Sequence, residues 1–156
     1  MLQLNSRNCG QPGRSSAETN KLFVYGTLLL DDVITILIGR IPYYQHAVAP
    51  GWQVVCLPQR VYPGLVPGAG EAVGKVFTDL TASEWATLDA FEDSAYTLAA
   101  IRVLLLSKTE TAALSYVWRG KHLNQPWSPA DLGRDELTNY LARCCSWRQR
   151  YEQRSG

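Results

Sequence analysis

Short strand-like segments follow one another along most of this chain, and few helix-like segments stand between them. The first run, residues 21–25, is apolar, rich in β-formers and stops at Gly26, so it predicts a buried strand. Similar runs predict strands over residues 46–57, 61–66, 73–80, 96–106 and 111–119. Because few strand–helix–strand units are possible, this order favours an α+β fold with a mixed or closed sheet over a doubly wound parallel one.

Proline and glycine interrupt these segments at defined places. Pro50-Gly51 interrupts the run over residues 46–57, and Pro58 separates this run from the one over residues 61–66. Between residues 63 and 70, prolines and glycines cluster and predict a loop with fixed turns. The sequence therefore separates the strand at 61–66 from the strand at 73–80.

Helix-forming segments carry recognisable ends. Acidic residues precede the apolar run 33–38 and a glycine follows it, which predicts a short helix. A Thr-x-x-Glu capping box at residues 81–84 opens a helix that runs to about residue 93. Ser-Pro at 128–129 resembles an N-cap followed by proline at the first helical position. Apolar residues spaced by three and four over residues 135–151 predict an amphipathic C-terminal helix.

Length and composition predict one domain preceded by a polar tail. The chain has 156 residues, 46% of them apolar, which suits a single core. Residues 1–20 lack the apolar core of a signal peptide, so we expect a disordered tail before a domain over residues 21–156. No run approaches the roughly 20 apolar residues of a transmembrane helix. We therefore expect a soluble cytoplasmic protein that does not bind a membrane.

Charge and motif content exclude several kinds of partner. Fifteen basic and fourteen acidic residues leave a formal charge of +1, which argues against a phosphate-binding surface and hence against nucleic acid. The sequence has no Gly-x-Gly-x-x-Gly, Walker or Gly-x-Ser-x-Gly motif. No Cys-x-x-Cys pair occurs among Cys9, Cys56, Cys144 and Cys145. We expect neither a metal nor a cofactor, and the oligomeric state is left open.

Glu92 stands out among the carboxylates of the predicted helix 82–93. At 100° per residue it shares a face with Trp85 and Leu88, and so lies between two large apolar side chains. It also falls in the last turn, where the helix dipole disfavours negative charge. Both effects would raise its pKa toward the range useful for proton transfer. The alternative is that the helix ends earlier and Glu92 points to water, and Asp89 lies at a comparable angle.

The second candidate is the segment Tyr25-Gly26-Thr27-Leu28. A strand that ends in glycine and continues into a small hydroxyl residue can turn its backbone N–H groups into a concavity. Such a concavity binds a carboxylate or a developing oxyanion, and Gly26 permits the close approach of a ligand. An ordinary strand exit is the alternative, because four residues alone make a weak motif.

Two signatures, taken together and in order, resemble those of the γ-glutamyl cyclotransferase-like superfamily. The first is Phe23-Val24-Tyr25-Gly26-Thr27-Leu28, and the second is Leu88-Asp89-Ala90-Phe91-Glu92-Asp93 followed by Tyr96. Residues 61–67 and 73–76 are similar to the family's proline-rich segment and following strand, and residues 113–118 to its later Tyr-x-Trp strand. The resemblance covers roughly residues 21–118 and is strongest to the avirulence-induced-gene-like (AIG2-like) branch.

The resemblance implies a small mixed β-barrel flanked by helices, with one cavity. It implies a cofactor-independent γ-glutamyl cyclotransferase, in which the substrate's α-amine attacks its own γ-carbonyl and releases 5-oxoproline and an amine. Glu92 would be the catalytic residue and would pass a proton from the α-ammonium to the leaving nitrogen. The residues implied to bind the γ-glutamyl substrate are Tyr25, Gly26, Thr27, Leu28, Tyr62 and Tyr96. Among these, Gly26, Thr27 and Leu28 would act through their backbone N–H groups.

The sequence departs from the family pattern at one position. Family members often carry an arginine two residues beyond the position of Tyr96, where this chain has Leu98, and Arg102 lies further along the same predicted strand. This departure keeps two alternatives open: a non-catalytic protein that binds a small metabolite on the same fold, and a hydrolase or acyltransferase that uses the same glutamate. On the C-terminal helix, we interpret as a solvated face Arg143, Arg148 and Arg150.

Overall fold

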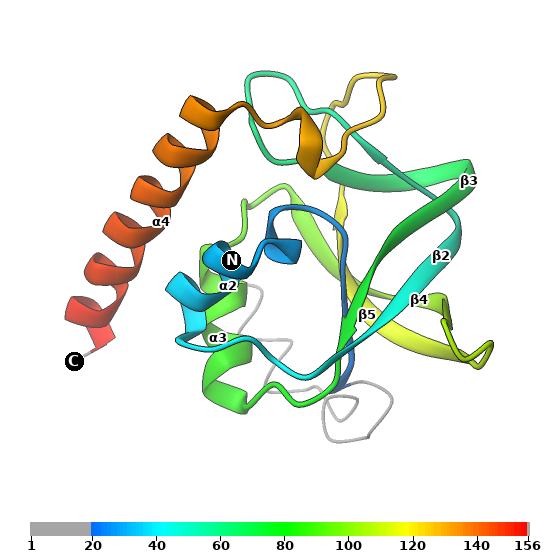
Figure 1. The fold of residues 1–156 in the computed structure, drawn as a ribbon, viewed down its shortest axis with the longest axis horizontal. Coiled ribbons are helices and arrows are strands. Elements are labelled where there is room, and N and C mark those ends of the chain that lie inside the picture. Colours follow the sequence, from blue (N-terminus) through cyan, green and yellow to red (C-terminus); the bar gives the residue numbers. More distant parts are fainter. Residues whose placement is uncertain (1–19, 156) are drawn as a thin grey trace.

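Five strands close into a barrel in the computed structural model, which describes residues 20–155 (Figure 1). The strands are β1 (Leu22–Val24), β2 (Tyr44–Val55), β3 (Gly64–Phe77), β4 (Tyr96–Leu105) and β5 (Glu110–Trp118). Their order is β1-β3-β2-β4-β5, and every neighbouring pair is antiparallel except β5 with β1. The predicted α+β class and mixed barrel are confirmed. The predicted tail lies outside the described residues, Asn20 apart.

The long hairpin of β2 and β3 shows that the loop predicted over residues 63–70 is wrong. The two strands pair on both sides of a register shift just after Pro50, where residues 68–70 of β3 have no partner on β2, and Pro67 lies beside this shift. Proline has no N–H, so strands tolerate it at bulges and where pairing on one side is not needed. Both prolines are exposed here. The runs predicted separately at 61–66 and 73–80 are therefore parts of one strand.

The barrel closes at β1, its shortest strand. β1 pairs with β3 over all three of its residues, but its register with β5 has a single pair, Leu22 with Leu114. Two hydrogen bonds of 2.8 Å reinforce this seam between β1 and β5. The Leu114 N–H donates to the Lys21 carbonyl, and Ser115 Oγ donates to the Phe23 carbonyl.

Two groups of buried side chains pack on opposite faces of β1. Phe23 and Tyr25 pack with residues from the other four strands inside the barrel. Leu22 and Val24 belong to the second group, which fills the space between the barrel and the helices. This division follows from the alternation of side chains along a strand. Because β1 is buried on both faces, its end is held firmly at the mouth of the barrel.

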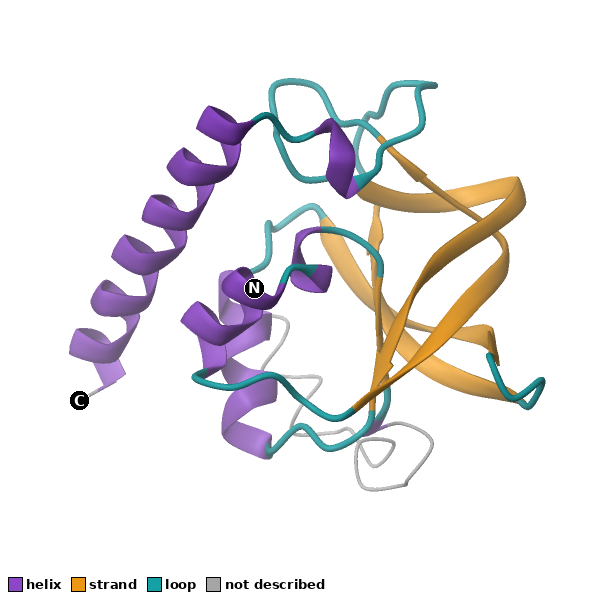
Figure 2. Ribbon diagram, in the orientation of Figure 1, coloured by secondary structure: helices purple, strands orange, loops and turns teal. Residues whose placement is uncertain are grey.

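The three α-helices of the described residues gather on one side of the barrel, with α4 outermost (Figure 2). They are α2 (Asp31–Ile38), α3 (Ala82–Phe91) and α4 (Arg134–Ser155), and the short 3-10 turns are η3 (Thr27–Leu29) and η4 (Pro129–Asp131). All the predicted helical segments are present, although the one at 128–129 forms a single 3-10 turn. No helix among residues 20–155 combines the length and apolar character needed to cross a membrane.

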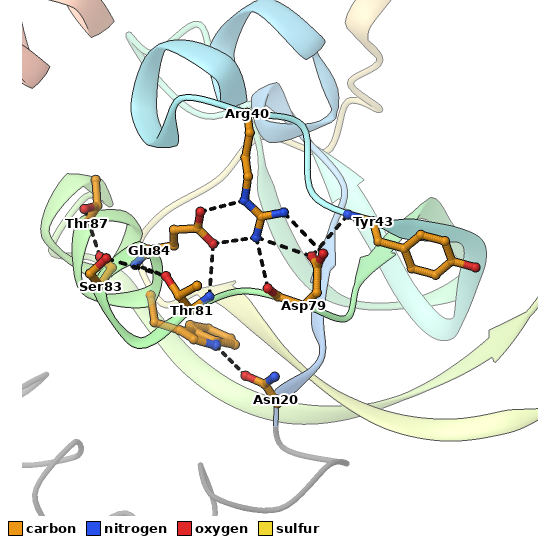
Figure 3. Close-up of polar contacts among 9 residues, drawn as sticks. Asn20, Arg40, Tyr43, Asp79, Thr81, Ser83, Glu84 and Thr87 are labelled. Carbon is orange, nitrogen blue, oxygen red and sulfur yellow. Dashed lines mark hydrogen bonds and ion pairs between the residues drawn. The ribbon is translucent and has the colours of Figure 1, made fainter.

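Arg40 joins the end of α2 to the start of α3 (Figure 3). The predicted capping box is present, since the Glu84 N–H donates to Thr81 Oγ1 and the Thr81 N–H donates to Glu84 Oε1. The Arg40 guanidinium donates to both Glu84 carboxylate oxygens at 2.7 Å and to the Asp79 carbonyl at 2.9 Å. These contacts fix the beginning of α3 and hence the direction in which its far end points.

Candidate active site

A cavity of about 430 Å³ lies between the mouth of the barrel and α4. Its volume falls in the range of small-molecule sites, roughly 300–1,000 Å³. The structure brings both sequence signatures to this cavity. Every predicted site residue lines it: Tyr25, Gly26, Thr27, Leu28, Tyr62, Glu92 and Tyr96. The chemical roles given to these residues remain predictions.

The turn that follows β1 forms one wall of the cavity. Gly26 packs directly on Pro63, and a Cβ at this position would lie 2.7 Å from Pro63 Cγ, so a larger residue does not fit. η3 begins at Thr27, and the first N–H groups of a helical turn have no partner within it. Thr27 Oγ1 lies 3.0 Å from Tyr140 Oη, which links the turn to α4. The Leu29 and Leu30 N–H groups donate to carbonyls within the turn, so the N–H groups of Thr27 and Leu28 stay the predicted donors to an anion.

Glu92 lies one residue beyond α3 rather than in its last turn. α3 ends at Phe91, and Glu92 is the C-cap, with extended backbone angles and an N–H that donates to the Leu88 carbonyl at 3.1 Å. The predicted helix end and the helical-face argument are therefore wrong in their geometry. The alternative, a side chain pointing to bulk water, does not hold either, because Glu92 lines the cavity. Its position comes from the way the chain leaves the helix.

The Glu92 carboxyl combines a raised pKa with freedom from partners. Burial, followed by the nearby charges of Asp89 and Asp93, raises its pKa from 4.5 to about 8. Across residues 20–155 no hydrogen bond or ion pair engages this carboxyl. A group that titrates near neutrality and is accessible from a cavity is suited to proton transfer. The raised pKa expected from the sequence is present, but burial and like charge produce it.

The two carboxylates beside it are both held by hydrogen bonds. Buried Asp89 accepts from Tyr116 Oη at 2.6 Å. Asp93 accepts from Tyr62 Oη at 2.6 Å and from the Arg60 guanidinium at 3.1 Å. Burial raises the pKa of Asp93, but these hydrogen bonds outweigh it and hold the pKa below its usual value. Glu92 and Asp93 both line the cavity, and of the two only Glu92 has no hydrogen-bond or ion-pair partner among the described residues.

The tyrosine hydroxyls around the cavity have fixed partners. Tyr25 Oη donates to the Tyr116 carbonyl at 2.6 Å, and Tyr96 Oη donates to the Pro63 carbonyl. Burial raises the pKa of Tyr62 to about 12, so its hydroxyl stays neutral at physiological pH. These side chains form a rigid, uncharged wall, and the role that fits them is positioning rather than acid–base chemistry.

A comparison with protein families identifies the chain's relatives. The family described as gamma-glutamyl cyclotransferase, AIG2-like, matches residues 22–138. The chain belongs to this family. The match contains both signatures and every predicted site residue, and it stops in the first turns of α4.

Relatives of this AIG2-like chain are found in Arabidopsis thaliana. AIG2-like protein D is 36% identical over 105 residues, which span 65% of this chain and 69% of that protein. AIG2-like protein C is 38% identical over 102 residues, which span 64% of this chain and 59% of that protein. The matches therefore cover part of each relative's length.

Solved structures show the same fold as this AIG2-like chain. A solution structure of an Arabidopsis thaliana protein aligns with a TM-score of 0.59 at 29% identity, over 85% of this chain and 87% of that one. A gamma-glutamyl cyclotransferase aligns with a TM-score of 0.56 at 19% identity, over 66% of this chain and 68% of that one. At that identity the second alignment supports the shared fold alone.

The arginine that the family pattern places near Tyr96 is not replaced from the same strand. Leu98 is buried between the barrel and the helices, opposite Tyr116 on β5. Arg102 is exposed and pairs with Glu110 at 3.1 Å, so it does not reach the cavity. Strand β4 therefore brings no cation to the site of this AIG2-like protein.

Helix α4 supplies cavity residues that the sequence interpretation missed. Arg143, Trp147 and Arg150 line the cavity. Both arginines are exposed, as the interpretation of a solvated face expects, but this face also borders the cavity. Arg148 forms an ion pair within the helix and does not line the cavity. The spacing from Tyr140 through 143 and 147 to 150 places these residues on one helical face. That repeat was available in the sequence, but nothing in it indicated that this face borders a cavity.

The described residues contain free cysteines and no cluster of side chains that could hold a metal ion. Cys144 is buried and Cys145 exposed, as their adjacency on a helix predicts. Within the part of the chain that the structure describes, no group of three His, Cys, Asp or Glu side chains is placed to hold a metal ion. Cys9 lies outside the described residues.

Proposed function

We propose that this protein is a γ-glutamyl cyclotransferase. The observation that carries the proposal is the Glu92 carboxyl, which lines the cavity with a pKa of about 8 and without a hydrogen-bond or ion-pair partner among the described residues. Family membership supports the same reaction class, because the family description is gamma-glutamyl cyclotransferase, AIG2-like. The substrate is a small molecule with a γ-glutamyl group, and the product common to all such substrates is 5-oxoproline.

The reaction moves two protons from one nitrogen to another. In its ionised form Glu92 takes a proton from the substrate's α-ammonium, and the free amine attacks the γ-carbonyl carbon to close a five-membered ring. In this proposal the N–H groups of Thr27 and Leu28 stabilise the oxyanion that develops. Glu92 then protonates the leaving nitrogen as the amide C–N bond breaks. A second proton passes from the ring nitrogen to the released amine, and Glu92 ends unchanged.

The pKa of Glu92 suits this transfer. A peptide α-ammonium titrates near 8 and an ordinary glutamate near 4.3, so a carboxyl with a pKa of about 8 is much better matched to an amine proton. An ordinary exposed glutamate would be a much weaker base. Because the attack is intramolecular, orientation in a shaped cavity supplies much of the remaining rate enhancement.

The test measures 5-oxoproline release from a panel of γ-glutamyl amino acids and γ-glutamylamines. We expect turnover by the wild type and a loss of about 100-fold or more in Glu92→Gln, because the substitution removes the proton shuttle but keeps the shape. Glu71→Gln, an exposed carboxylate on β3, is the matched control and keeps its activity. Thermal unfolding of both variants checks that they are folded.

Other outcomes identify the alternatives. Free glutamate in place of 5-oxoproline would show a hydrolase, and a new γ-glutamyl product an acyltransferase. Binding of the panel without any turnover would show a metabolite-binding protein on the same fold. Full activity in Glu92→Gln would mean that another group carries the proton.

A further inference from the structure

The two walls of the cavity differ in charge and in burial. On the barrel side the lining residues Val24, Tyr25, Gly26, Thr27 and Leu28 are all buried. On the α4 side the lining is mixed: Tyr140 and Cys144 are buried, whereas Ala142, Arg143, Ser146 and Arg150 are exposed. The cavity therefore opens along α4, and a ligand that reacts beside the barrel extends past this helix on its way to solvent.

The arginines on the open side are available for a ligand. Within residues 20–155 neither Arg143 nor Arg150 has a carboxylate partner. The Arg143 guanidinium lies 5.7 Å from the centre of the Tyr140 ring, which limits its freedom without neutralising it. The arginines that do form ion pairs are Arg40, Arg60, Arg102 and Arg148. Two uncompensated cations at the rim of a cavity form a site for an anion.

The contacts of α4 place these cations relative to the reacting groups. At one end of the side of α4 that faces the cavity, the Tyr140 hydroxyl is hydrogen-bonded to the Thr27 hydroxyl in the turn after β1. Two turns further on, Trp147 packs edge-on against Phe91 at 5.1 Å, and Phe91 directly precedes Glu92. Arg143 lies between these two contacts, and Arg150 lies beyond the second, about 10 Å further along the helix axis. The arginines thus border the exit path from the proton-transfer group.

We propose that Arg143 and Arg150 bind a carboxylate on the leaving amine, so that the preferred substrates are γ-glutamyl amino acids or peptides rather than γ-glutamylamines without a carboxylate. This inference rests on the proposed cyclotransferase function and names its substrate class. The γ-glutamyl group, which all substrates share, occupies the buried end. The variable leaving group occupies the open end, where α4 supplies the charge that β4 does not.

The test compares two substrates that differ by one carboxylate, γ-glutamyl-L-alanine and γ-glutamylethylamine. We expect the wild type to prefer γ-glutamyl-L-alanine in kcat/KM by at least tenfold. In the double variant Arg143→Gln with Arg150→Gln, this preference falls to within about twofold because turnover of γ-glutamyl-L-alanine drops. Turnover of γ-glutamylethylamine stays nearly constant. Arg134→Gln, on the same helix but outside the cavity lining, is the matched control and keeps the preference.

Several results would overturn the inference. An equal loss for both substrates would assign the arginines to the α-carboxylate of the shared γ-glutamyl group, and no loss for either would leave them without a role in binding. In both cases 5-oxoproline is still released, so the proposed function stands. If the wild type releases none from either substrate, the proposed function fails. In that case, calorimetric titration of each compound into the protein tests carboxylate recognition by itself. Equal affinity of the wild type and the double variant for γ-glutamyl-L-alanine would exclude recognition of the carboxylate by the two arginines.

Discussion

The two walls of the cavity were built from different parts of the chain and under different constraints. The barrel wall consists of buried groups with fixed partners: Gly26 against Pro63, and tyrosine hydroxyls on backbone carbonyls. The α4 wall has an exposed part that carries two arginines without acidic partners in the described chain. The family match ends at residue 138, so it contains the first wall and leaves out nearly all of the second. Under the proposed function, this difference means that the residues for the reaction shared by the family and those for the choice of substrate lie on opposite walls of one cavity.

The pH dependence of turnover gives the largest expected effect and depends on Glu92 at the end of α3, not on the α4 wall. Glu92 acts as a base in its ionised form, so activity is present above its pKa of about 8 and is lost below it. We expect kcat/KM to fall by about tenfold per pH unit below this value, or roughly 100-fold at pH 6. The double arginine variant should keep this limb, because it alters the other wall. A flat profile between pH 6 and 8 would contradict the assignment of Glu92.

Gly26→Ala tests how tightly the barrel wall is built. The added Cβ would lie 2.7 Å from Pro63 Cγ, so the turn must shift and its N–H groups lose their placement. We expect a loss of tenfold or more in kcat/KM and of about 1–3 kcal/mol in the free energy of unfolding. Gly70→Ala is the control, because a Cβ there meets nothing within 4 Å. Wild-type activity in Gly26→Ala would show that the turn does not bind the reacting group.

Tyr140→Phe breaks the bond that joins the two walls and has the smallest expected effect. It removes the contact of 3.0 Å between Tyr140 Oη and Thr27 Oγ1 but keeps the ring. We expect a loss of about 0.5–1.5 kcal/mol in the free energy of unfolding, measured by denaturant titration. KM should rise by a few fold with little change in kcat, because α4 holds the substrate less firmly. A change in kcat alone would instead place the hydroxyl in the chemical step.

The barrel wall was predictable because its signals are local. Gly26 after a buried strand is a pattern that a few consecutive residues carry. For Glu92 the predicted electrostatics were right and the predicted geometry was wrong. The apolar surroundings persist past the end of α3 at Phe91, although the helix does not. Burial beside like charges raises a pKa regardless of the secondary structure that provides the burial.

Other features depend on distances that no local pattern encodes. Pro67 predicts a loop if every residue of a strand needs hydrogen-bond partners on both sides. In the structure β3 nevertheless includes Pro67, which lies beside a register shift. Arg143 and Arg150 have the composition of a solvated helical face, and their proximity to the barrel mouth depends on how α4 packs. The cavity, which lies between segments far apart in sequence, could be inferred from the family resemblance but not from periodicity.

Strand β1 links the closure of the barrel to the geometry of the candidate site. It closes the barrel through a single residue pair with β5, and the turn that leads into η3 follows from its last residues. Opening of this contact would therefore also change the geometry of the turn that lines the cavity. If the proposed function holds, partially unfolded molecules would be inactive, and the active fraction of a preparation would report the fraction of closed barrels.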